Sequence, residues 1–228
     1  MLKKHIPNTI TCLNLISGCI ATYFAFQSDY TMALLFIIVG AVFDFFDGMT
    51  ARLLGVSSPM GKELDSLADV VTSGVAPAMI LLQMLQQHAP DSRVAAVAFL
   101  VPLFAAYRLA KFNLDTRQSH SFLGLPVPSN ALIWVGVALS GSLVPSTWPM
   151  VALFVLVSLV GDVLMVSELP LFSLKFNFKE LAWRTNSVQY IFLIGCALII
   201  VLLRDWIAIS VIILWYIVLS AFTQRKHA

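Results

Sequence analysis

Charged side chains are scarce in this chain. Lysine, arginine, aspartate and glutamate together make up 11% of the 228 residues, whereas 59% of the residues are hydrophobic. A soluble domain has about 25% charged residues, because its water-facing surface needs them. The composition therefore excludes an ordinary soluble protein and indicates that the lipid bilayer surrounds most of the chain.

Basic runs and cysteines are also lacking. The 14 lysine and arginine residues never form a run, and the net charge is only +2, so the chain has no electrostatic footprint for nucleic acid. The three cysteines are too few for a disulfide framework or a metal cluster, and all lie in apolar stretches: Cys12, Cys19 and Cys196.

Long apolar runs are what the chain has instead. A membrane-spanning helix takes about 20 residues, and eight such runs account for nearly the whole sequence. The predicted spans are 9–26, 31–54, 64–85, 93–112, 128–144, 148–165, 188–203 and 206–222. We therefore expect an all-α integral membrane protein, a polytopic bundle of about eight transmembrane helices that forms a single domain over residues 1–228.

The distribution of basic residues predicts the orientation in the membrane. Lysine and arginine are enriched in the cytoplasmic loops of membrane proteins, and eight spans leave both termini on one side. That side holds Lys3, Lys4, Arg52, Lys62, Arg108, Lys111, Arg117, Lys175, Lys179, Arg184, Arg225 and Lys226, against Arg93 and Arg204 on the other. We expect cytoplasmic termini, and we expect residues 167–187, where apolar and basic residues alternate, to lie in the cytoplasmic interface.

Four acidic residues cluster in the second and third predicted spans. Asp44 and Asp47 are three residues apart, and Asp65 and Asp69 are four apart, so each pair shares one face of its helix. The turn at 55–60 folds the two helices antiparallel, which can bring both faces together. Asp44 lies about 20 Å along its helix from Thr31, which puts the cluster in the cytoplasmic third of the bilayer.

Carboxylates this close repel one another, and inside a membrane they are costly and usually functional. Divalent cations compensate such charge, and oxygen-only ligands favour Mg²⁺ or Mn²⁺ over zinc. The histidines are too scattered to form a zinc site: His5, His88, His120 and His227. Two ions would neutralise four aspartates, and a paired-metal site suits phosphoryl transfer. The alternative is ion pairing with Arg52 and Lys62, although two cations cannot neutralise four carboxylates.

Gly48, directly after Asp47, has two interpretations. A glycine in a helix lets a ligand approach the backbone closely, or it simply allows another helix to pack there. The residue type alone does not separate the two.

The spacing of these residues matches a known pattern. Asp44-x₂-Asp47-Gly48-x₂-Ala51-Arg52-x₈-Gly61-x₃-Asp65-x₃-Asp69 resembles the signature of the CDP-alcohol phosphotransferase family. The resemblance implies an integral membrane enzyme, usually homodimeric, with a six-helix catalytic core, here about 1–166, and two further helices at about 188–223. Members transfer a substituted phosphate from a CDP-linked donor to an alcohol and release CMP.

Further segments resemble the branch of this family that uses serine; they are 7–11, 65–71, 74–77, 107–113 and 122–128. This resemblance implies transfer of the phosphatidyl group from CDP-diacylglycerol to the hydroxyl of L-serine in the membrane. Two departures concern the acceptor: Thr72-Ser73 stands where Ser-Phe is more usual, and Ser129-Asn130 where small residues are common. Glycerol 3-phosphate or an inositol phosphate remains an alternative acceptor, although the extra phosphate should demand more cations.

A polytopic transporter is the alternative outside the enzymes. Transporters usually bind their substrates near the membrane midplane, between paired halves. Neither feature is present in this sequence.

The resemblance also assigns roles to individual residues. It implies that all four aspartates bind the metal ions and that Asp69 is in addition the general base. Gly48 would lie against the cytidine, and Arg52 would hold the diphosphate. Further hydrogen-bond partners of the nucleotide would be Asn8, Thr11 and Ser58.

The acceptor needs a separate set of residues. Free serine carries a carboxylate, so its pocket needs at least one cation. Arg108 and Lys111 are three residues apart on one face of the fourth predicted span, at its cytoplasmic end. Either they bind serine or they are interfacial anchors that follow the positive-inside rule.

Overall fold

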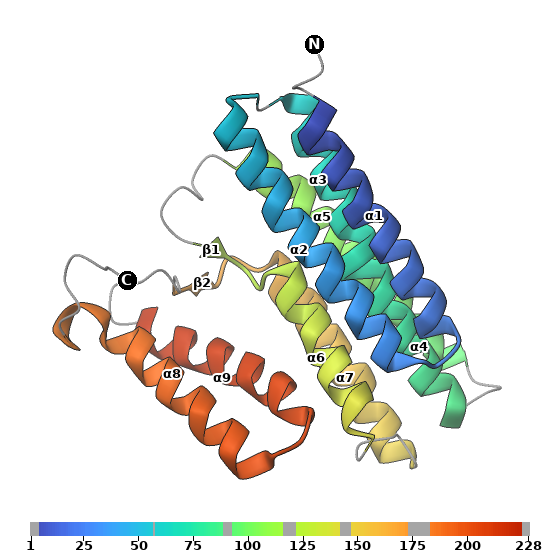
Figure 1. The fold of residues 1–228 in the computed structure, drawn as a ribbon. Helices are drawn as coiled ribbons and strands as arrows, with labels where there is room; N and C mark the ends of the chain where they lie inside the picture. Colours follow the sequence, from blue (N-terminus) through green and yellow to red (C-terminus); the bar gives the residue numbers. More distant parts are fainter. Residues whose placement is uncertain are drawn as a thin grey trace.

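The computed structural model describes residues 5–56, 58–88, 93–115, 122–141, 147–172 and 183–224. Long helices dominate these residues (Figure 1). In chain order the elements are α1 (His5–Phe26), α2 (Tyr30–Leu54), α3 (Pro59–Asp69), the π-helix η2 (Val70–Val75), α4 (Ala76–His88), the 3₁₀-helix η3 (Arg93–Phe99), α5 (Leu100–Leu114), β1 (Phe122–Leu123), α6 (Val127–Ser140), α7 (Trp148–Val166), β2 (Pro170–Leu171), α8 (Trp183–Leu203) and α9 (Ile207–Gln224).

Each predicted span corresponds to a helical segment. Within the described residues, six segments are long and apolar enough to cross a membrane, and α6 and α9 are apolar but shorter. The expectation of an all-α, polytopic membrane protein is confirmed.

Local capping sets the ends of α2 and the start of α3, the two helices that carry the aspartates. Asp29 caps α2 by accepting a hydrogen bond from the Met32 N–H (3.1 Å), and α2 ends where Gly55 adopts a left-handed φ of 61°. The third span begins at Pro59 rather than at the predicted residue 64, because the Ser58 hydroxyl caps it by accepting from the Gly61 N–H (3.0 Å). The left-handed Gly55 and the Ser58 cap lie at the turn between α2 and α3.

The third span is not a uniform α-helix. Directly after Asp69 the chain widens into the π-helix η2 and then continues as α4. Short π-helical segments are rare and often occur at functional sites. Here the wider turn follows the last of the four aspartates.

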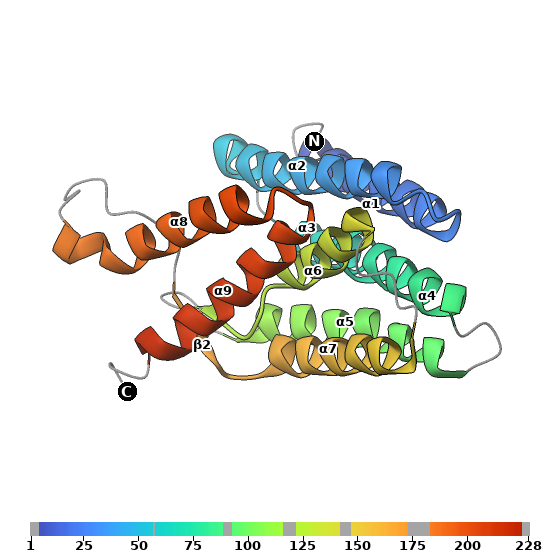
Figure 2. The same cartoon turned by 90° about the horizontal axis from the view of Figure 1, so that it is seen from below.

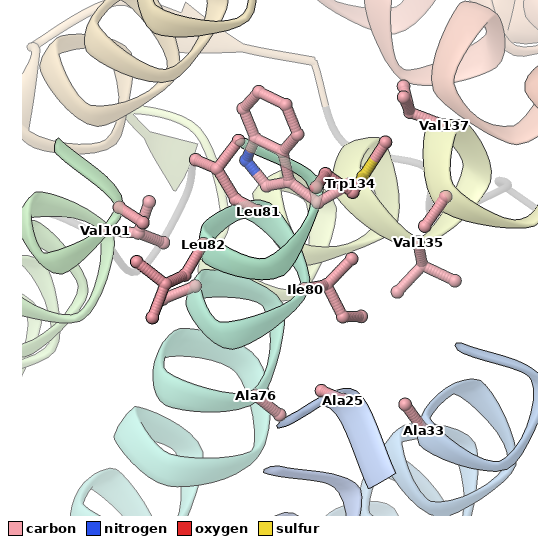
Figure 3. Packing of buried hydrophobic residues seen from close by; sticks show 14 of the residues in the cluster. Ala25, Ala33, Ala76, Ile80, Leu81, Leu82, Val101, Trp134, Val135 and Val137 are labelled. Carbon is pink, nitrogen blue, oxygen red and sulfur yellow. The ribbon is translucent and has the colours of Figure 1, made fainter. Parts of the chain in front are cut away.

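The helices form layers. Figure 2 shows α1 and α2 along one side, α4 and α6 in the middle, and α5 and α7 on the opposite side. The interior is apolar and centres on α4, whose Ile80 and Leu81 are fully buried near Trp134 of α6 (Figure 3). Helix α4 therefore forms the buried axis of the bundle, and α3 continues that axis up to the acidic cluster.

Helices α8 and α9 pack against each other at one end of the bundle (Figure 1). Helix α9 packs on α6, where the Ser210 hydroxyl donates to the Ile133 carbonyl (2.7 Å) beside Gly136. The Tyr216 hydroxyl donates to the Phe172 carbonyl (3.0 Å). The C-terminal pair is thus attached through α6 and the segment after β2, away from the aspartates.

Among the described residues, one short pair of strands accompanies the helices. Strands β1 and β2 pair antiparallel, with Phe122 opposite Leu171 and Leu123 opposite Pro170. Gly124 follows β1 with a φ of 73°, and its N–H donates to the Leu169 carbonyl (2.9 Å). Strands of two residues are too short to show a period of two, so the sequence pattern could not reveal them.

Two further predictions fall partly outside the described residues. Of the segment expected at the interface, residues 173–182 are not described, and Pro170–Leu171 form β2. Seven of the basic residues used for the orientation also lie outside: Lys3, Lys4, Arg117, Lys175, Lys179, Arg225 and Lys226. The orientation in the membrane stays a prediction.

Candidate active site

The carboxylates of three of the four aspartates come together between α2 and α3. Asp44, Asp47 and Asp65 each offer a carboxylate oxygen, and these oxygens all lie within 4.8 Å of one another. Asp47 is buried, and Oδ1 of Asp65 is buried without a hydrogen-bond partner among the described residues. The acidic faces of α2 and α3 therefore meet, as the spacing of the aspartates predicts.

Asp69 lies one turn further along α3, at its last residue. It is not among the three clustered carboxylates, but its charge interacts with those of Asp44 and Asp47 and with the cation of Arg108. Asn14 of α1 donates a hydrogen bond from Nδ2 to Oδ1 of Asp69 (3.3 Å). The fourth carboxylate is thus beside the other three, with partners of its own.

Helix α1 forms the wall behind the aspartates. The Thr11 hydroxyl lies 2.6 Å from Oδ2 of Asp47 and donates to it, and Asn14 contacts Asp69 as described above. Thr11 and Asn14 are three residues apart and both buried, so they form one polar face of α1. Sequence reasoning missed Asn14, although this polar spacing at i and i+3 was a signal that could have found it.

The two nearby cations do not neutralise the cluster. Nε of Arg52 donates to the Gly48 carbonyl (3.0 Å), and Nζ of Lys62 donates to the Asn113 carbonyl (2.8 Å). Within the part of the chain that the structure describes, neither forms an ion pair with any of the four aspartates. The alternative of charge compensation by Arg52 and Lys62 is therefore wrong for this arrangement.

The donor set fits a divalent cation. It consists of carboxylate oxygens within one small volume, one of them buried and without a partner. Hard ions such as Mg²⁺ and Mn²⁺ prefer such ligands, whereas zinc prefers histidine or cysteine. Neither of those two residue types is among the described residues that line the adjoining pocket.

A cavity of about 890 Å³ adjoins the cluster, which is large enough for a ligand of nucleotide size. All five residues predicted to contact the nucleotide line it. The lining residues are Pro7, Asn8, Thr11, Asp47, Gly48, Ala51, Arg52, Val56, Ser58, Pro59, Gly61, Lys62 and Asp65. The turn between α2 and α3 and the start of α1 therefore build one concave, partly polar surface beside the acids.

Gly48 faces this open space. A side chain at this position would meet nothing within 4 Å, so no neighbouring helix needs the glycine for packing. The packing interpretation of Gly48 is therefore wrong, and the exposed backbone is available to a ligand in the cavity.

The side chains of Arg108 and Lys111 lie in different surroundings. Arg108 is 8% exposed, its charge interacts with that of Asp69, and its Nε has no hydrogen-bond partner among the described residues. Lys111 instead donates from Nζ to the Val166 carbonyl (3.3 Å) and pairs with Glu168 (3.7 Å). Of these two cations, only Arg108 is buried and has a charge that interacts with that of Asp69.

The fold and the site together define a polytopic α-helical membrane protein with a carboxylate cluster beside a nucleotide-sized pocket. The family model of the CDP-alcohol phosphatidyltransferases matches residues 4–172. The chain belongs to this family, as its aspartate spacing predicted. Helices α8 and α9 lie outside the matched range.

Several similar curated proteins share the name CDP-diacylglycerol–serine O-phosphatidyltransferase. The protein of that name from Bacillus subtilis (strain 168) is 40% identical over 125 residues, covering 55% of this chain and 70% of the relative. The Helicobacter pylori protein (strain ATCC 700392 / 26695) is 32% identical over 220 residues, covering 93% and 87%. The Saccharomyces cerevisiae protein (strain ATCC 204508 / S288c) is 39% identical over 154 residues, covering 60% and 55%.

Proposed function

We propose that this protein transfers the phosphatidyl group of CDP-diacylglycerol to the hydroxyl of L-serine, forming phosphatidylserine and releasing CMP. The observation that carries the proposal is the group of three carboxylates, Asp44, Asp47 and Asp65, beside the cavity of about 890 Å³. The names of the relatives support the substrates.

The cavity residues would bind the donor. The Arg52 guanidinium would bind the diphosphate as a planar, two-pronged donor, and the open backbone at Gly48 would lie against the cytidine. Asn8, Thr11 and Ser58 also line this cavity and would form hydrogen bonds with the nucleotide. The Thr11 hydroxyl has a second task, because it also donates to Asp47.

The transfer itself would need a base beside the acceptor. Asp69 would accept the proton of the serine hydroxyl, whose oxygen forms a bond to the phosphorus that carries the diacylglycerol. The bond from that phosphorus to CMP breaks, and CMP leaves. Two Mg²⁺ or Mn²⁺ ions, held by the four aspartates, would supply the positive charge that this transfer requires.

The single buried cation whose charge interacts with Asp69 favours serine over a phosphorylated acceptor. Arg108 is buried beside it, whereas Lys111 binds the end of α7 and Glu168. One buried guanidinium suits one carboxylate, while glycerol 3-phosphate or an inositol phosphate would bring a doubly charged group. The transporter alternative is set aside, because the chain belongs to an enzyme family.

The same proposal covers the assembly and the orientation. We propose a single catalytic domain with a core at about 1–166 and the additional helices at about 188–223, in a homodimer, with the active site and both termini in the cytoplasm. The bias of basic residues supports the orientation, and the family resemblance supports the dimer.

Purified protein tests the acceptor directly. We expect CMP release from CDP-diacylglycerol in the presence of serine, and little release with glycerol 3-phosphate or an inositol phosphate. Release with glycerol 3-phosphate but not with serine would overturn the serine assignment and leave only the family chemistry.

Replacing Arg108 with alanine is expected to raise the KM for serine by about 10–100-fold, since a hydrogen bond to a charged group contributes about 1.5–3 kcal/mol. The KM for CDP-diacylglycerol should change little, because Arg108 does not line the donor cavity. Both constants come from CMP release with each substrate varied in turn.

Lys111→Ala is the matched control for this experiment. It removes a cation from the same helix, but one that is bound to Val166 and Glu168, so the KM for serine should stay the same. An equal effect of the two substitutions would remove Arg108 from the acceptor pocket.

A further inference from the structure

A chain of two hydrogen bonds lies behind Asp69. The Thr72 hydroxyl donates to Oδ1 of Asn14 (2.8 Å), and Nδ2 of Asn14 donates to Oδ1 of Asp69 (3.3 Å). Asn14 is completely buried and Thr72 is 1% exposed. Because buried polar groups are costly unless they are bonded, this chain defines a strongly preferred arrangement of the three side chains.

Thr72 and Asp69 together set the direction of the Asn14 amide. An asparagine side chain has a donor end and an acceptor end, and the Thr72 hydroxyl has a single proton. Among the described residues, the acceptors of that proton are two oxygens of Asn14, the side-chain Oδ1 at 2.8 Å and the backbone carbonyl at 3.2 Å. With Oδ1 turned to Thr72, the NH₂ group must face Asp69; the reversed amide would direct its oxygen at a carboxylate.

The packing around Thr72 holds its hydroxyl in place. Thr72 belongs to η2, three residues after Asp69, and its side chain fills the space left by two glycines of neighbouring helices. A Cβ at Gly18 of α1 would collide with Oγ1 of Thr72, and a Cβ at Gly40 of α2 would lie 2.6 Å from its Cγ2. Because Oγ1 and Cγ2 of Thr72 are both enclosed, this β-branched side chain keeps one χ1 rotamer.

We propose that Thr72 and Asn14 are positioning residues of the transfer reaction. Thr72, acting through Asn14, holds Oδ1 of Asp69 so that Oδ2 faces the reacting hydroxyl. Neither residue lines the donor cavity. The inference rests on the proposed role of Asp69, and it assigns a function to Thr72, one of the positions at which the sequence departs from the family pattern.

Two substitutions of Thr72 separate positioning from packing. Thr72→Val keeps the shape and removes the hydroxyl, whereas Thr72→Ser keeps the hydroxyl and removes the methyl beside Gly40. We expect Thr72→Val to lower kcat about tenfold with both KM values within about twofold of the original, and Thr72→Ser to stay within about twofold in kcat. Full activity of Thr72→Val, or an equal or larger loss in Thr72→Ser, would overturn the inference.

The double variant tests whether Thr72 acts through Asn14. Asn14→Ala should lower kcat at least as much as Thr72→Val, and combining the two should add no further loss, since coupled residues are not additive. Multiplied losses would contradict the inference. Thr22→Val is the matched control: its hydroxyl donates to the Gly18 carbonyl of its own helix (2.8 Å), so kcat should not change.

Mn²⁺ binding supplies a readout that does not depend on turnover. Free Mn²⁺, measured by electron paramagnetic resonance during titration of the purified protein, should show weaker binding by Thr72→Val and unchanged binding by Thr72→Ser. Equal affinity of Thr72→Val and the unaltered protein would overturn the inference. If the unaltered protein does not use serine, the proposal of serine as the acceptor is wrong. The comparison of Mn²⁺ affinities still tests whether Thr72 and Asn14 position Asp69.

Discussion

Asp69→Asn is expected to lower kcat for CMP release by about three orders of magnitude, within the range that a general base contributes. The substitution keeps the shape of the side chain, and the amide oxygen can still accept the hydrogen bond from Nδ2 of Asn14. What it removes is the group that takes the proton and one negative charge beside Asp44 and Asp47. CDP-diacylglycerol should still bind, because Asp69 does not line the donor cavity.

The measurement is CMP release with donor and serine varied in turn, together with equilibrium binding of the donor. Asp44→Asn gives the contrast, since loss of one of the three clustered carboxylates should weaken metal and donor binding together. Asp29→Asn is the control: this residue caps α2 at the far end, and asparagine caps a helix equally well. An active Asp69→Asn variant would exclude Asp69 as the base.

Removal of divalent cations is expected to abolish CMP release. The clustered aspartates have no ion-pair partner among the described residues, so without cations their charges repel one another and the incoming diphosphate. Addition of Mg²⁺ or Mn²⁺ should restore turnover, because both accept oxygen ligands, whereas Zn²⁺ should restore it poorly. The measurement is the rate of CMP release after exhaustive chelation and after titration with each ion.

Two controls make the chelation result decisive. A chelator saturated with Mg²⁺ beforehand should leave the rate unchanged, which separates metal removal from direct inhibition. Donor binding without metal should be weak in the unaltered protein. Full activity after exhaustive chelation would contradict the metal site.

The short-range features of this protein could be predicted from its sequence. A bilayer demands helices of a minimum length and apolarity, so the eight runs mark the helices. Spacings of three and four residues place Asp44 with Asp47 and Asp65 with Asp69 on single helix faces. The turn at 55–60 predicts that α3 folds back antiparallel to α2. The approach of the two pairs of aspartates could therefore be predicted as well.

Contacts between distant segments were decided only by the tertiary structure. Asn14 and Thr72 are far apart in the chain, and no local pattern states that α1 covers the acids of α3 or that η2 turns a hydroxyl towards α1. Arg108 and Lys111 look equivalent in sequence, yet one lies beside Asp69 and the other at the end of α7. Helical periodicity determines which residues share a face; which helix covers that face depends on how all the helices pack together.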